Sequence, residues 1–466
     1  MSTTDYKHPE YVRMLPLWQQ VRDTCAGSHA VKARREAYLP NPSEDPNSTE
    51  GRRRYQSYLH RAVYLNATGR TLRGLVGVAF SNWPRFVLPR GAEYLADDVN
   101  GSGVGLVNQA QSALADVLQT GRGGLLADCS SRDETEQLRP RTQAEAEAEG
   151  WRVTLNYYAA ERILTWEVHG DRLTRLVLQE THAKYEGGEV EYIPQLRELV
   201  MEGGKQVVHI WRQFSDKGKF IKVATYKTSL PSITFHFIGA ENNDPWPDTP
   251  PLLDLSDLNL AHYRNSADYE ESAFLMGQPM LAITGVTDEW VKERGAVYVG
   301  SRAPLALPTG GDAKFLQVQP NTLAKEAMQD KERMMAMMGA RLLAPTAAPM
   351  TATQSASETK AAYSVLSNVC DNLSEAYRAA LGSVARMLNP YSPDQVDFAI
   401  DTRFNDLMLD ANAIRETVAA WQAGLVPQSD AWATLRRLGV VDQGKTDDQL
   451  RAEIDAQGPA LDLDAA

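Results

Sequence analysis

A run near the end of the chain has the spacing of a phosphate-binding loop. Residues 439–446 read GVVDQGKT, which fits the G-x-x-x-x-G-K-[S/T] pattern of nucleotide hydrolases. That loop needs a strand before it and a parallel sheet around it. Here residues 429–438 are expected to form a helix, few residues follow the loop, and Asp442 would repel a bound phosphate. We interpret the match as coincidental and keep a nucleotide hydrolase as an alternative hypothesis.

Two other glycine runs and the cysteines are also weak candidates for chemistry. Residues 101–106 (GSGVGL) lack the third glycine of a dinucleotide-binding fingerprint and no strand is expected before them. Residues 121–128 (GRGGLLAD) favour a tight turn that enters a buried strand. Cys129 follows that turn and is expected to be a core cysteine, because the sequence indicates no base beside it. The three cysteines and eight histidines show no C-x-x-C or H-x-x-x-H spacing, so we expect no metal, no cofactor and no enzyme.

Composition and charge set further bounds. The 466 residues are 43% hydrophobic and 23% charged, as in an ordinary folded protein. No apolar run is long enough for a membrane helix, and the first residues show no secretory signal, so we expect a soluble protein folded in a reducing cytosol. The net charge is −12, so any contact with DNA is expected to be loose. The same charge is also typical of simple solubility.

The first half of the chain divides into a helical and a β-rich part. Residues 1–150 read as mainly helical, and apolar positions at helical spacing predict a helix over 55–76. From residue 151 to 250, short runs rich in valine, isoleucine and aromatic residues alternate with turns such as Glu202-Gly203-Gly204-Lys205. That alternation is typical of antiparallel hairpins. The predicted fold class is therefore α+β, mainly α.

The second half alternates long helices with short modules. In residues 355–389, the apolar residues recur at spacings of three and four, which predicts one continuous buried stripe along a long helix capped by Ser355 or Ser357. Before it, residues 344–354 are small, uncharged and proline-punctuated, which is typical of a loop. The expected order is a helix over 251–279, a compact mixed module over 280–320, a second helix over 321–343, the loop, the long helix and a C-terminal part over 390–466.

This order of elements resembles the portal proteins of tailed bacteriophages. Local sequence is also similar to a portal-like phage family labelled a domain of unknown function. The similar stretches are GRGGLLAD at 121–128, NYYAAERI at 156–163 with Trp166, PPLLDLSDLN at 250–259, HYRNSADY at 262–269 and GQP at 277–279.

The resemblance implies a ring-forming protein of the virion. It implies wing modules over 1–150 and 151–250, stem helices over 251–279 and 321–343, a clip over 280–320, a tunnel loop over 344–354, and a short crown after residue 390. The ring is usually a dodecamer at one capsid vertex, assembled in the host bacterial cytoplasm. Its implied partners are double-stranded DNA, the terminase large subunit, head–tail adaptor proteins, and the major capsid and scaffolding proteins, with no membrane.

The resemblance also nominates site residues, none of them catalytic. For the DNA channel, the candidates are Pro345, Thr346, Pro349, Met350, Thr351 and Thr353 in the loop, with Lys325, Lys331, Arg333 and Arg341 on the second stem helix; helix-surface ion pairs are the other interpretation of these four cations. For terminase and adaptor docking, the clip candidates are Glu289, Trp290, Lys292, Tyr298, Arg302 and Lys314. A capsid scaffolding or minor head protein is the main alternative function.

Overall fold

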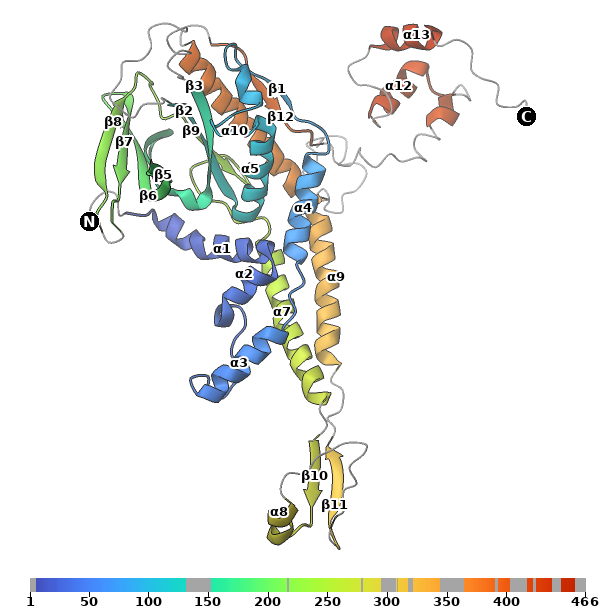
Figure 1. The fold of residues 1–466 in the computed structure, drawn as a ribbon. Coiled ribbons are helices and arrows are strands. Elements are labelled where there is room, and N and C mark those ends of the chain that lie inside the picture. Colours follow the sequence, from blue (N-terminus) through green and yellow to red (C-terminus); the bar gives the residue numbers. More distant parts are fainter. Residues whose placement is uncertain are drawn as a thin grey trace.

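Most of the strands lie between residues 122 and 239, with longer helices before and after them, so the fold is mixed α and β with more helix than strand (Figure 1). The computed structural model describes residues 6–130, 152–215, 218–277, 280–294, 307, 309–316, 322–343, 364–389, 393–402, 417–421, 425–437 and 446–456. The N-terminal elements are α1 (Pro9–Ala26), α2 (Ser28–Ala33), η1 (Arg35–Ala37), α3 (Thr49–Arg61), α4 (Ala67–Ala79), β1 (Arg85–Val87), η2 (Glu93–Ala96) and α5 (Leu106–Thr120).

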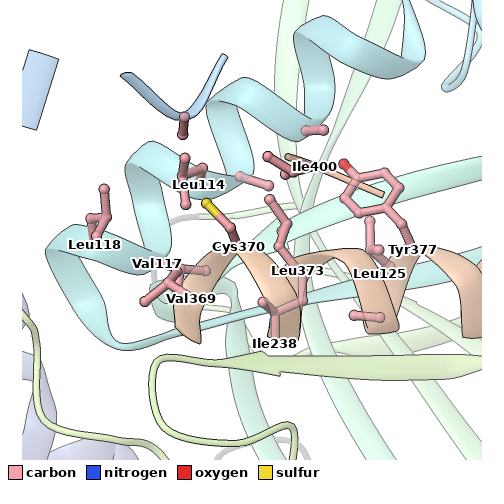
Figure 2. Close-up of a cluster of buried hydrophobic side chains, with 14 of the residues drawn as sticks. Leu114, Val117, Leu118, Leu125, Ile238, Val369, Cys370, Leu373, Tyr377 and Ile400 are labelled. Atoms are coloured by element: carbon pink, nitrogen blue, oxygen red, sulfur yellow. The ribbon is translucent and has the colours of Figure 1, made fainter. Parts of the chain in front are cut away.

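The centre of the body is a three-stranded antiparallel sheet in the order β3-β2-β9, formed by β2 (Arg122–Ser130), β3 (Arg152–Ala159) and β9 (Phe235–Gly239). Helix α10 (Val365–Leu388) packs across this sheet and against α5. Figure 2 shows Cys370, Leu373 and Tyr377 of α10 among side chains of α5 and the sheet. The apolar residues spaced three and four apart therefore form the buried stripe that the sequence predicts. Its fully buried members are Leu366, Cys370, Leu373, Tyr377, Ala380 and Val384.

A second sheet lies beside the body, and we use the name wing for this sheet alone. Its five antiparallel strands follow chain order, and glycines at positive φ, such as Gly203 and Gly204, make the tight turn between β6 and β7. One face packs against α1, where Trp18 is completely buried. The strands are β4 (Ile163–His169), β5 (Arg172–Glu186), β6 (Glu189–Glu202), β7 (Lys205–Arg212) and β8 (Ile221–Lys227), with η3 (Ala160–Arg162) before them.

A buried ionic cluster joins the two sheets. Arg197 of β6 donates to Asp128 of β2 over 2.7 Å and to Glu180 of β5 over 2.8 Å. Glu180 also accepts hydrogen bonds from Tyr158 (2.5 Å) and Gln195 (2.6 Å). The pKa of Glu180 is lowered despite its burial, because Arg197 and the three hydrogen bonds stabilise the carboxylate. The cluster fixes the wing against the body.

A helix pair projects from the body, away from the two sheets (Figure 1). It consists of α7 (Leu253–Met276) and α9 (Leu323–Leu343), which contact each other along their length. At the far end lie α8 (Asp288–Arg294) and the two-stranded antiparallel sheet of β10 (Met280–Thr284) and β11 (Asp312–Leu316). We call α7 and α9 the stem pair and the distal group the tip module. The remaining elements are β12 (Asp397–Ala399), paired with β1, and the helices α12 (Gln428–Arg437) and α13 (Asp447–Ala456).

The structure corrects several boundaries. The predicted helix over 55–76 is interrupted, because Ala62 has extended ψ and the Asn66 side chain caps a new helix by accepting from the Gly69 amide. The cap of α10 is Ser364, whose hydroxyl accepts from the Ser367 amide, and neither Ser355 nor Ser357, which lie outside the described residues. The buried strand that the sequence predicts after the tight turn at residues 121–128 is confirmed as β2, whereas β8 was not predicted.

Candidate assembly and docking surfaces

The base of the stem pair is fixed to the body through one buried amide. The Asn259 side-chain oxygen accepts from the Thr68 amide (3.1 Å), the Thr68 hydroxyl (2.9 Å) and the Tyr64 hydroxyl (3.0 Å), and its nitrogen donates to the Leu65 carbonyl (2.8 Å). Asn259 is completely buried. These bonds join α7 to the start of α4 and satisfy four buried polar groups at once.

Further along α7, side chains of α3 support the stem. Tyr58 donates to Asp268 over 2.6 Å, and Arg61 pairs with Glu271 while its guanidinium lies 4.2 Å from the Phe274 ring. Phe274 is still 42% exposed. The distal half of α7 therefore contacts α3 on one side and is exposed to solvent on another.

Several large apolar side chains of the stem pair are exposed to solvent. Met334 and Met337 of α9 are 52% and 56% exposed, and Leu275 of α7 is 56% exposed. A shallow groove between the two helices has a mixed apolar and charged lining of Asp254, Asp257, Leu258, Ala261, Met334, Met337, Met338 and Arg341. Flexible thioethers beside a groove suit a surface that packs against another protein.

The four cations nominated on α9 do not form one strip. Lys325 is exposed, Lys331 is half-buried and donates to the Ala327 carbonyl, and Arg333 forms an exposed ion pair with Asp330 at 3.0 Å. Arg341 lines the groove beside two aspartates. The helix-surface interpretation therefore fits Arg333. The loop candidates Pro345, Thr346, Pro349, Met350, Thr351 and Thr353 lie outside the described residues.

The docking candidates that the structure describes lie in the tip module. Glu289 and Lys292 are exposed on α8, and Trp290 of the same helix is half-buried. Lys314 of β11 is exposed and pairs with Asp312 at 2.9 Å. Tyr298 and Arg302 lie outside the described residues. The tip module thus presents charges of both signs at the point farthest from the body.

Two backbone amides of the glycine-rich run over 101–106 already bind a carboxylate of the chain, that of Asp98. The Asp98 carboxylate accepts from the amides of Gly101 (2.8 Å) and Gly103 (2.9 Å), and Arg152 pairs with it at 2.8 Å. These contacts lower the pKa of Asp98, the Gly103 amide having the largest effect. The amides that a dinucleotide phosphate would need are therefore occupied by the chain itself.

The match to a phosphate-binding loop lacks its structural context where the chain is described. Helix α12 precedes it and α13 follows it, so no strand leads into the loop. Residues 439–445 themselves lie outside the described residues.

The three cysteines differ in exposure. The expectation that Cys129 is a core residue is wrong: it is exposed, because β9 covers β2 only as far as Leu126 and Cys129 lies beyond that cover. Cys25 and Cys370 are buried, and burial raises the pKa of the Cys25 thiol to about 12 and that of Cys370 further still. Both buried sulfurs are held as protonated thiols, which are poor nucleophiles.

Sequence reasoning missed one serine–histidine pair. The His236 Nε2 atom lies 2.9 Å from the Ser383 hydroxyl, and His236 lines a pocket between the wing, β9 and α10. Burial, helped by Arg386, lowers the pKa of His236 to about 4. Ser383 is only 3% exposed, and Arg386 also donates to it over 3.0 Å. Because a substrate cannot reach the hydroxyl, the pair is interpreted as packing across β9 and α10. The two residues are 147 positions apart in the sequence, so no local motif could have indicated the pair.

Two features are absent from the part of the chain that the structure describes. None of the helices there combines the length and apolar character that a membrane span requires. In the same part of the chain, no three His, Cys, Asp or Glu side chains gather where they could hold a metal ion.

Comparison with known proteins gives two matches. A family described as Domain of unknown function (DUF4055) matches residues 251–388, which include the stem pair, the tip module and α10. A chain of the solved structure titled "Virion of native gene transfer agent (GTA) particle" is 15% identical, with 92% of this chain and 95% of that chain covered and a TM-score of 0.36. No curated protein matches. Chains this distant need not share a fold or a function, so the proposal below rests on the geometry of this chain.

Proposed function

We propose that the chain is a portal-type subunit of a phage-like virion. Copies of it would form a ring, with twelve as the number that the resemblance implies, around a channel at one capsid vertex. Duplex DNA would pass through the channel during packaging, retention and ejection. Assembly in the host cytoplasm and the successive docking of a terminase large subunit and head–tail adaptors belong to the same proposal, as do contacts with capsid and scaffolding proteins.

One observation carries this proposal: a helix pair projects from a two-sheet body, carries a small tip module at its end and exposes the methionines Met334 and Met337 on α9. A single chain gains nothing from such a projection, because its apolar surface stays in water. Identical projections placed side by side around an axis would bury that surface in repeated heterologous contacts, which close into a ring. The tip modules would then gather at one end, available to partners.

The proposed mechanism is mechanical and involves no covalent step. The channel must accept any DNA sequence, so it needs backbone contacts and no base-specific ones. The overall negative charge of the chain would keep those contacts weak enough for the duplex to slide.

The test is to weaken the stem surface while sparing the body. The double substitution Met334→Glu and Met337→Glu places two charges on the exposed methionine positions and is expected to prevent ring formation, leaving folded single subunits by negative-stain imaging and circular dichroism. The matched control is Tyr185→Glu with Tyr192→Glu, at tyrosines of the β5–β6 hairpin that are 78% and 71% exposed. Rings from the methionine variant, or no ring from the wild type, would contradict the proposal.

A scaffolding or minor head protein remains the second candidate. Its supporting observation is the same exposed stem surface, which any capsid-binding protein could use. A hollow ring distinguishes the two, because a scaffolding protein need not form one.

A further inference from the structure

Helix α4, which packs beside the stem pair, differs from α7 and α9 in its charge. Its sequence, ATGRTLRGLVGVA, contains two arginines and no aspartate or glutamate, within a chain whose net charge is −12. Arg70 and Arg73 are both exposed, and neither side chain has a hydrogen-bond or ion-pair partner among the described residues. The neighbouring α9 is different, because Arg333 is neutralised by Asp330 and Glu332 contacts His262.

The two arginines lie on one face of α4 together with two glycines. Positions 70, 73, 74 and 77 have the i, i+3, i+4, i+7 spacing of a single helix face. Gly74 and Gly77 are exposed, and a Cβ at either position would meet nothing within 4 Å. The opposite face is buried in the body through Leu75, Val76 and Ala79. The cationic face is therefore open and has a flat surface beside its charges.

This face is continuous with the side of α9. The two helices touch at Gly339, whose Cβ position lies 3.3 Å from the Thr71 hydroxyl, and Figure 1 shows them side by side at the top of the stem. Next to that contact, α9 exposes the small side chains of Ala336 and Ala340. The open face of α4 and the small side chains beside the contact together leave room for a rod-shaped partner at the junction of α4 and α9.

We infer that Arg70 and Arg73 of α4 are the main phosphate contacts of this chain with duplex DNA, in place of the α9 cations that the sequence nominated. The inference rests on the proposed function, which supplies the duplex, and it specifies where the duplex is held. Guanidinium groups bind phosphate oxygens in a bidentate manner, and no carboxylate on α4 opposes them. Side chains three residues apart on a helix lie about 5–6 Å apart, so both can reach one strand of the backbone. Two contacts per subunit in a ring would hold a duplex without reading its sequence.

The test measures affinity for a short mixed-sequence duplex by fluorescence anisotropy across a series of salt concentrations, using the full chain. Arg70→Gln with Arg73→Gln is expected to weaken binding at low salt by about tenfold or more and to flatten the salt dependence, since each lost phosphate contact removes about 0.9 from the slope of log K against log salt. The matched control is Arg52→Gln with Arg53→Gln, two exposed arginines of α3 that also form no ion pair with the described residues. The control is expected to keep the wild-type slope.

The outcomes separate this inference from the proposed function. Equal slopes for the α4 variant and the control, or no DNA binding by the wild type at low salt, would overturn the inference even if rings form. Loss of assembly in the α4 variant alone would place Arg70 and Arg73 in a contact between copies and would also overturn it. A wild-type chain that forms no ring but binds DNA through these arginines would support the inference and refute the portal proposal.

Discussion

Helices α9 and α10 are of similar length, 21 and 24 residues, but they are buried to very different degrees. Thirteen residues of α10 are buried, whereas Met335 is the only buried side chain of α9 among those that the structure describes. Both helices are rich in apolar residues. The difference shows that apolar composition alone does not determine how deeply a helix is buried within one chain. The proposed ring would cover the exposed side of α9, whereas α10 is already covered by its own chain.

The largest expected effect that distinguishes the two regions is a cavity in the body. Leu373→Ala removes a completely buried side chain from α10 and should lower the free energy of unfolding by about 2–5 kcal/mol. Met337→Ala, on the exposed side of α9, should change the stability of the isolated subunit by less than about 0.5 kcal/mol. Chemical denaturation of both variants, at a concentration where wild-type subunits are separate, provides the comparison. Similar losses in both would show that α9 is supported by its own chain.

A second difference concerns pH. His236 in the body has its pKa lowered from 6.5 to about 4, mainly by burial. The unfolded chain therefore binds this proton more readily than the folded chain. The contribution of neutral His236 is fully present above pH 6.5 and is lost as the pH falls toward 4, by up to about 3 kcal/mol. His236→Gln keeps a side-chain nitrogen near Ser383 but cannot titrate there.

The pH dependence is tested by the difference between wild type and His236→Gln in unfolding free energy at pH 7 and pH 5. The wild type should lose more stability over this interval than the variant. Parallel curves for the two proteins would mean that His236 is already protonated, or accessible to water, in the folded body.

A smaller effect is expected at the junction of the two regions. Asn259→Leu removes the acceptor of the Thr68 amide and hydroxyl, which should cost about 1–3 kcal/mol, whereas the Tyr64 hydroxyl keeps its hydrogen bond to the Thr24 carbonyl. Because α7 then loses its link to α4, hydrogen exchange should accelerate in α7 more than in α10. Uniform acceleration in both helices would show that the junction and the body unfold as one unit.

Local periodicity predicted the main helices better than the edges of the sheets. The stripe from Leu366 to Val384 and the stem helices could be predicted because each repeats a pattern over many residues. The pairing of β1 with β12 could not, since Arg85 and Ala399 meet only after the chain folds. Strand β8 was missed because nearly all of its side chains are exposed, so it has no hydrophobic face to mark it.

Some of the candidate surfaces could likewise be predicted from the sequence, and others could not. The tip module and the stem pair could be predicted from the order of the elements. The role of α4 could not, because the sequence does not show which face of a helix lies against the body. Asp98 is a similar case: its capture of the Gly101 and Gly103 amides depends on the fold of the loop.

The most direct test of the central claim is the mass and shape of the purified protein in solution, measured by native mass spectrometry with negative-stain imaging of the same sample. The account predicts a particle with an axial hole and a mass of about 620 kDa, twelve copies of the 51.6-kDa chain, closed by repeated identical contacts. A 51.6-kDa monomer at every concentration tested would contradict it.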